Sequence, residues 1–70
     1  MSKVQTYLSA RFQISRWPYY SVNWLIYDLR NEAAKDELRE EIRELRKSGV
    51  IDLVGGLNGW LIQIKDETKF

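Results

Sequence analysis

Basic side chains recur every three or four residues through residues 33–48, the most charged stretch of the chain. Guanidinium and ammonium groups bind phosphate and carboxylate oxygens, so this spacing could serve a polyanion or an acidic partner. At about 100° per residue these basic residues would follow one flank of a helix, and they are Lys35, Arg39, Arg43, Arg46 and Lys47. The acidic residues would follow the other flank, and they are Asp36, Glu37, Glu40, Glu41 and Glu44. The two sets cancel in number, so either the helix is simply solvated or only its basic flank makes a contact.

Aromatic side chains gather in a segment where an ordinary loop would be polar. Trp17, Tyr19 and Tyr20 flank Pro18, which restricts the residue before it to an extended backbone. The segment either packs on the core as a short extended piece or exposes a contact surface, because aromatic residues are enriched at interface hot spots. In the second interpretation the candidate partner interface is Trp17, Tyr19, Tyr20 and Leu57.

Residues for catalysis or metal binding are scarce. The chain has no His and no Cys, so its serines lack the usual activating base and a zinc-type ligand set is missing. Asp28 and Glu32 stand four apart and could form an acid–base pair, but exposed carboxylates at that spacing are typical of a plain helix surface. We therefore predict a protein that is not an enzyme and needs no metal or cofactor.

Length and composition indicate one small domain. The 70 residues are 44% hydrophobic and 13% aromatic. These side chains must stabilise the core, because a chain without Cys has no disulfides to do so. The net charge of +1 is too small to indicate nucleic acid or membrane by bulk electrostatics. The sequence has no apolar run long enough to span a membrane and no signal-peptide core. We expect a cytoplasmic protein that makes no membrane contact.

Residues 33–48 predict a helix because they contain no Pro or Gly and are rich in strong helix formers. Its apolar positions share one helical face, and they are Ala34, Leu38, Ile42 and Leu45. Gly49 then stops the helix.

Residues 50–65 predict a β-hairpin, with strands at 50–54 and 60–65 and a turn at 55–59 that contains the hairpin signal Asn58-Gly59. Trp60, Ile62 and Ile64 form an apolar strand face that should cover the helices or another chain.

The N-terminal half is less clearly patterned. Residues 1–14 fit either a helix, through a stripe that includes Val4, Leu8 and Phe12, or an alternating strand; we predict a helix. Residues 15–20 form a connection, and Ser21 should cap a second helix at residues 21–31. Residues 66–70 predict a frayed polar tail, although Phe70 could dock back.

This order of elements resembles a winged helix-turn-helix domain over nearly the whole chain. Residues 45–51, Leu-Arg-Lys-Ser-Gly-Val-Ile, resemble the end of that family's recognition helix where it leads into the first wing strand. Residues 21–25 resemble the start of its second helix. The resemblance implies an α+β fold, a three-helix winged helix-turn-helix with a C-terminal β-hairpin wing.

In that family the helix before the wing usually enters the major groove of DNA. The resemblance therefore implies a DNA-binding role for Asn31, Lys35, Arg39 and Arg43, with the wing tip near a minor groove or the backbone. The chain departs from the family at the turn near residues 30–33, which lacks the usual Gly. It also departs at the wing tip, which has no Lys or Arg.

Two functions follow from these observations. The first is a small DNA-binding regulatory or accessory protein, acting in transcription regulation as a homodimer because one such module covers few base pairs. The second is a winged-helix protein–protein interaction module without DNA binding, such as an inhibitor, an antirepressor or an assembly adaptor. The acidic flank, the uncharged wing tip and the many aromatic residues favour the second function.

Overall fold

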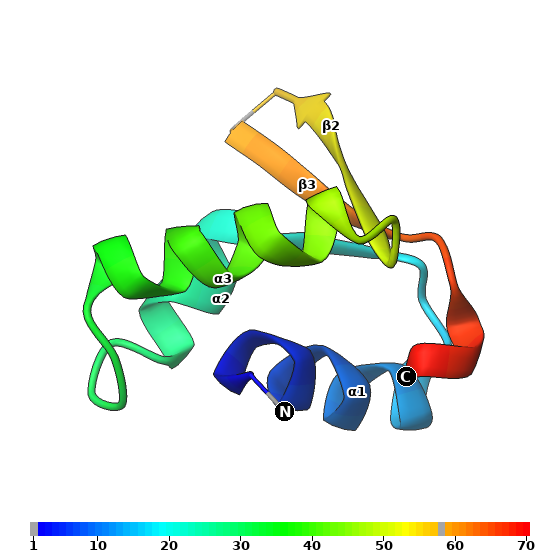
Figure 1. Ribbon diagram of the computed structural model, residues 1–70, viewed down its shortest axis with the longest axis horizontal. Coiled ribbons are helices and arrows are strands. Elements are labelled where there is room, and N and C mark those ends of the chain that lie inside the picture. Colours follow the sequence, from blue (N-terminus) through cyan, green and yellow to red (C-terminus); the bar gives the residue numbers. More distant parts are fainter. Residues whose placement is uncertain (1, 58) are drawn as a thin grey trace.

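The computed structural model describes residues 2–57 and 59–70. Three α-helices and a three-stranded antiparallel sheet make up this part of the chain, which confirms the predicted α+β class (Figure 1). In chain order the elements are α1 (Lys3–Ser15), β1 (Tyr19–Ser21), α2 (Val22–Asp28), α3 (Lys35–Lys47), β2 (Ile51–Gly56), β3 (Gly59–Ile64) and the short 3-10 helix η1 (Glu67–Lys69). In the view of Figure 1, α1 lies beneath α3, α2 lies behind α3, and the hairpin of β2 and β3 rises above them. No helix in the described ranges is long and apolar enough to cross a membrane.

The sheet has β3 at its centre, with β1 on one side and β2 on the other. Ile62 of β3 is paired with Tyr20 on β1 and with Leu53 on β2. The sequence predicted a connection at residues 15–20 that could pack on the core as a short extended piece. Tyr19–Ser21 is extended, but it is a strand of the sheet and not only a connection, so that prediction is corrected. Pro18 holds the chain extended before β1, and its carbonyl oxygen accepts a 2.8 Å hydrogen bond from the Ile64 amide.

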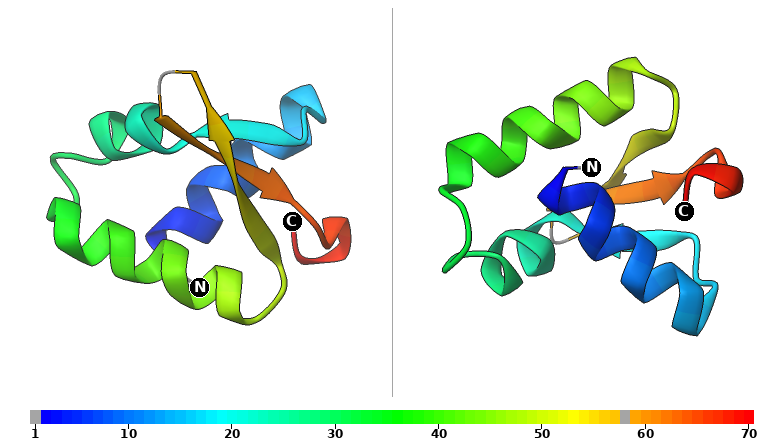
Figure 2. Two further views of the ribbon diagram at one scale, coloured as in Figure 1. Left: turned by 90° about the horizontal axis from the view of Figure 1, so that it is seen from above. Right: turned by 60° about the horizontal axis from the view of Figure 1, so that its bottom comes forward.

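The core lies between the three helices and the inner face of the sheet. From α1, the side chains of Val4, Leu8 and Phe12 are almost fully buried, whereas Ile14 is 87% exposed. A spacing of four between buried residues is the helical pattern, so the helix predicted for this segment is the one found. Figure 2 shows the same arrangement from two further sides, with α1 running under the space between α3 and the sheet.

The second helix is shorter than predicted. The expected range was residues 21–31, but α2 ends at Asp28, after Ser21 caps its start by accepting a 3.3 Å hydrogen bond from the Trp24 amide. Leu29 is buried, and its carbonyl oxygen accepts hydrogen bonds from the amides of Glu32 and Ala33 at 2.9 and 3.1 Å. These bonds close a turn around a residue anchored in the core, so the chain reverses before another helical turn can form.

The charged helix begins two residues later and ends one residue earlier than the predicted range of 33–48. Ala34 is extended, with ψ of 152°, and it offers no side-chain cap, so α3 starts at Lys35. Gly49 has φ of 82°, which is the left-handed conformation expected of a helix stop. Leu38 and Ile42 are buried as their spacing predicts.

Both hairpin strands extend into the predicted turn, since β2 ends at Gly56 and β3 begins at Gly59. Gly55 is paired with Trp60, and Gly56 is paired with Gly59, so glycines assigned to the turn belong to the strands. Asn58, half of the expected Asn-Gly signal, lies outside the described residues. The predicted apolar face holds for Ile62 and Ile64, but Trp60 is 59% exposed because it lies near the hairpin tip, beyond the core.

The C-terminus is ordered rather than frayed. Phe70 is buried, and its carbonyl oxygen accepts hydrogen bonds from Ser9 Oγ at 3.0 Å and from Gln13 Nε2, both on α1. Asp66 caps η1 by accepting hydrogen bonds from the amide and hydroxyl groups of Thr68, and this bonding lowers the pKa of the Asp66 carboxyl. The tail therefore docks on the C-terminal half of α1, which is the alternative that the apolar Phe70 allowed.

Candidate nucleic-acid interface

The acidic flank of α3 faces the beginning of α1. Glu41 Oε1 accepts a 2.9 Å hydrogen bond from the Val4 amide, and Glu37 Oε1 lies 3.5 Å from Lys3 Nζ. The first amides of a helix have no partner within the helix and carry partial positive charge. Two of the five carboxylates on this flank therefore have a structural task, which is to hold the start of α1 against α3.

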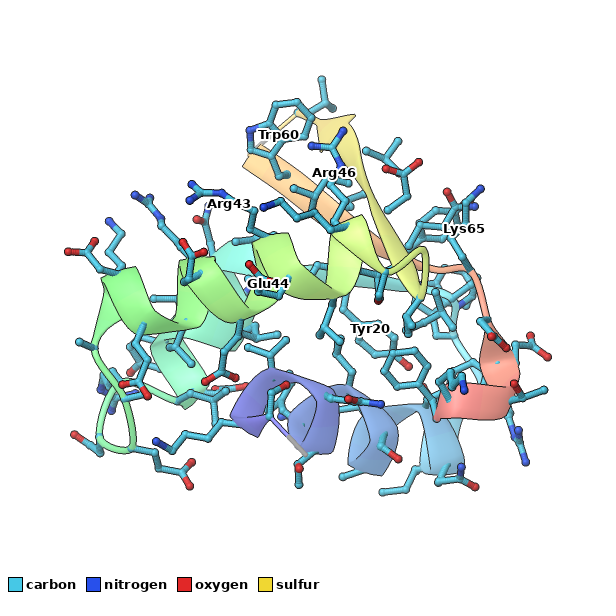
Figure 3. All side chains as sticks on the ribbon, viewed as in Figure 1. Tyr20, Arg43, Glu44, Arg46, Trp60 and Lys65 are labelled. Carbon is cyan, nitrogen blue, oxygen red and sulfur yellow. The ribbon has the colours of Figure 1, made fainter. Side chains whose placement is uncertain are left out.

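The basic flank lines a groove of about 420 Å³ between α3, the hairpin and the start of α2. Arg39, Arg43 and Arg46 provide its wall from α3, Trp60 and Leu53 come from the hairpin, and Val22 and Asn23 come from α2. In Figure 3, Arg43 and Arg46 project toward the side from which the hairpin rises, with Trp60 near its tip. We call this feature the arginine groove.

The charges of the arginine groove remain at the surface. Arg43 Nη1 lies 2.8 Å from Glu40 Oε2, and Arg46 Nε lies 3.4 Å from Asp52 Oδ1, with all four side chains about half exposed or more. Within residues 2–57 and 59–70, Arg39 makes no ion pair and no side-chain hydrogen bond. Exposed ion pairs contribute only about 0–1 kcal/mol, so a phosphate could compete for these guanidinium groups.

Gly59 sets how closely the hairpin approaches α2. Its φ is 126°, and a Cβ atom added there would lie 2.9 Å from Asn23 Nδ2. Only glycine adopts such a conformation readily and leaves that space open. The side of the arginine groove formed by Trp60 and Asn23 therefore depends on this glycine.

Three of the four predicted DNA-binding residues lie together on α3. Lys35, Arg39 and Arg43 follow the basic flank, and the last two line the groove. Asn31 is exposed in the turn between α2 and α3, and that turn lies at the end of α3 away from the hairpin (Figure 1). Sequence reasoning did not assign Arg46 and Trp60 to this site. Arg46 could have been predicted, because its spacing places it on the same basic flank as Arg39 and Arg43. Trp60 could not, because its alternation with Leu61 and Gln63 indicated the apolar face of the hairpin.

The four predicted partner-interface residues divide between two places. Trp17 and Tyr19 are 62% and 38% exposed and line a hollow beside α1, β1 and α2. Tyr20 lines the same hollow but is half-buried, with its hydroxyl 3.2 Å from Ser15 Oγ. Leu57 is fully exposed at the hairpin end, where it lines a different hollow with Trp60.

No family model, no curated protein and no solved structure matches this chain. Among the residues that the structure describes, no three His, Cys, Asp or Glu side chains come together in a way that could hold a metal ion. The surfaces of the molecule itself, above all the arginine groove, therefore provide the evidence for its function.

Proposed function

We propose that the chain is a winged helix-turn-helix protein that binds nucleic acid through the basic flank of α3. The element order α1-β1-α2-α3-β2-β3, with β3 between the other two strands, supports this fold. In such a domain α3 is the recognition helix, and β2 and β3 form the wing. A small regulatory or accessory protein acting on DNA, including one that regulates transcription, fits this assignment.

The main support for this proposal is the set of side chains that line the arginine groove. The described residues that line the arginine groove include three arginines and no acidic side chain. The helix is neutral when its charges are counted along the sequence, but on this side Arg39 has no carboxylate partner among the described residues, and the carboxylates that pair with Arg43 and Arg46 are exposed. Phosphate contacts from Arg and Lys supply most of the sequence-independent affinity of DNA-binding proteins, so a positive groove of this kind suits a phosphate backbone.

In this proposal the arginines and Trp60 make different kinds of contact with the nucleic acid. Arg39 and Arg43 can form paired hydrogen bonds with a phosphate or with the edge of a guanine. Trp60 offers an exposed ring at the rim, where it could stack on a base or a sugar. This use of Trp60 gives the wing a role in binding although residues 55–57 and 59 carry no charge.

The test is a fluorescence anisotropy titration of a labelled mixed-sequence duplex at low and high salt. We expect binding that weakens steeply between about 50 and about 200 mM salt. Arg39→Ala and Arg43→Ala should each weaken binding without altering the circular dichroism spectrum. Lys69→Ala is the matched control, because it removes the same charge from η1, next to α1. Unchanged binding in both arginine variants would remove α3 from the interface.

A protein–protein interaction module without DNA binding is the second candidate. The exposed Trp17 and Tyr19 and the uncharged hairpin tip favour it. The acidic flank favours it less than the sequence suggested, because Glu37 and Glu41 are engaged with α1. Absence of duplex binding at low salt, together with a stable complex with another protein, would select this function.

A further inference from the structure

A second surface of the molecule is apolar and stays open to solvent. The C-terminal half of α1, the strand β1 and the helix α2 enclose a hollow of about 670 Å³. Its apolar and aromatic lining consists of Ile14, Trp17, Tyr19, Tyr20 and Trp24. Of these, Ile14 is 87% exposed, Trp24 is 66% exposed and Trp17 is 62% exposed. We call this feature the aromatic hollow.

The exposed apolar area is large for so small a protein. A Trp or Tyr side chain presents about 150–250 Å², so the exposed parts of Trp17, Tyr19 and Trp24, together with Ile14, amount to roughly 500 Å². A patch of this size is comparable to the largest patch of a typical monomer, about 300–600 Å², and such patches are often functional. A stable interface takes about 800 Å² from each partner, so this patch could supply more than half of one partner's share.

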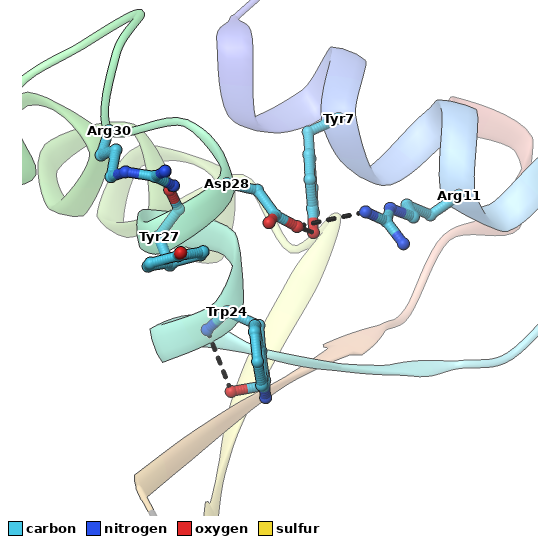
Figure 4. Close-up of polar contacts among 7 residues, drawn as sticks. Tyr7, Arg11, Trp24, Tyr27, Asp28 and Arg30 are labelled. Atoms are coloured by element: carbon cyan, nitrogen blue, oxygen red, sulfur yellow. Dashed lines mark hydrogen bonds and ion pairs between the residues drawn. The ribbon is translucent and has the colours of Figure 1, made fainter.

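The charges in the aromatic hollow indicate what covers it. Its lining holds one cation and one anion, Arg11 and Asp28, whose Nη2 and Oδ2 atoms lie 3.1 Å apart. Tyr7 donates a 2.5 Å hydrogen bond to the same Asp28 oxygen, as Figure 4 shows. The described lining of the aromatic hollow therefore has no net charge, whereas a phosphate backbone or an acidic peptide needs a surplus of cations.

We propose that a second copy of this chain covers the aromatic hollow in a two-fold symmetric dimer. In such an interface each patch meets its own copy, so a neutral apolar surface with an exposed Ile14 at its edge can be self-complementary. The aromatic hollow and the arginine groove share no lining residue among those described, so the arginine groove of each copy can stay open in the dimer. This inference goes beyond the proposed function and does not depend on it.

The test measures the mass of the full chain in the absence of nucleic acid, by sedimentation equilibrium over a wide concentration range. We expect a reversible dimer of twice 8.4 kDa. Ile14→Glu and Trp24→Ser should each raise the dissociation constant at least about tenfold, because each change is made twice across a two-fold interface that excludes water. Leu57→Glu is the control, because Leu57 is exposed but does not line the aromatic hollow.

Three outcomes would overturn the proposal. A monomer at all concentrations excludes the dimer, and a dimer that both variants leave intact places the interface elsewhere. A monomeric protein whose duplex binding is weakened by Ile14→Glu would show that nucleic acid covers the aromatic hollow instead. A dimer that binds no DNA would leave this inference standing and overturn only the function proposed for the arginine groove.

Discussion

The two flanks of α3 carry equal numbers of charges but make very different contacts. On the acidic flank, Glu41 and Glu37 turn toward the first residues of α1. On the basic flank, Arg39, Arg43 and Arg46 line an open groove beside the hairpin. Charges that balance along a sequence can make different contacts in space: two carboxylates of the acidic flank reach α1, while the arginines of the basic flank pair at most with exposed carboxylates.

This difference predicts that double substitutions on the two flanks affect duplex affinity differently. Arg39→Ala combined with Arg43→Ala should weaken duplex binding at least about 100-fold at low salt, because each guanidinium contributes a charge-assisted hydrogen bond of about 1.5–3 kcal/mol. Glu37→Gln combined with Glu44→Gln should leave affinity unchanged or slightly raised. Anisotropy titrations of both double variants make the comparison. Equal losses of affinity would show that the two flanks do not differ in function.

The next largest effect concerns the wall of the groove opposite α3. Gly59→Ala should destabilise the protein by about 1–3 kcal/mol, because φ is 126° there and the new Cβ would crowd Asn23. Urea unfolding measures this loss, and duplex affinity should fall with it as Trp60 shifts. Gly55→Ala serves as the control, since a Cβ there would meet only a ring atom of Trp60 at 3.9 Å. Equal stability of the two variants would argue against the close approach of the hairpin to α2.

The structural task of the acidic flank predicts a loss of stability without a loss of binding. Glu41→Ala should lower the unfolding free energy by about 1 kcal/mol, because the Val4 amide loses its partner at the start of α1. Glu40→Ala, on the same helix but exposed, should change it by less than about 0.5 kcal/mol. Urea unfolding of the two variants separates them. Similar small effects would mean that Glu41 does not cap α1.

The smallest expected effect concerns a second polar contact that ties α1 to another helix. Burial of Tyr7 and its hydrogen bond to Asp28 raise the pKa of the Tyr7 phenol from 10.0 to about 12. The folded state thus holds this proton more tightly than the unfolded state. The resulting stabilisation is complete below about pH 10 and is lost as the pH rises toward 12.

Tyr7→Phe should lack this alkaline dependence. The difference in unfolding free energy between wild type and variant should therefore shrink between pH 10 and pH 12. Both proteins share the other tyrosines and lysines, so the difference isolates Tyr7. A difference that does not change over this range would show that the phenol has its ordinary pKa in the folded protein.

Local pattern was enough to predict the main elements. The spacing of Leu38 and Ile42, and Gly49 at the helix end, located α3 to within two residues at each end. The stripe of Val4, Leu8 and Phe12 indicated α1, although the same stretch also alternates like a strand. Each of these signals lies within one element, where period and capping chemistry act directly.

Features that depend on distant parts of the chain were missed. The strand β1 has three residues, too few for a period, and it exists because β3 pairs with it from 40 positions further along the sequence. The early end of α2 follows from the burial of Leu29. The docking of Phe70, which the sequence offered only as an alternative to a frayed tail, follows from its hydrogen bonds to α1. The exposure of Trp60 reflects how far the hairpin extends past the helices. Each of these features depends on contacts between residues that are far apart in the sequence, so local patterns do not predict it.

The most direct test of the account is the salt dependence of duplex binding by wild type and by the Arg39→Ala, Arg43→Ala double variant. Each phosphate contact contributes about 0.9 to the slope of log affinity against log salt. The account predicts a slope smaller by about two in the double variant, because two phosphate contacts are lost. An unchanged slope, or a wild-type protein that binds no duplex at low salt, would contradict the claim that the basic flank of α3 is a nucleic-acid surface.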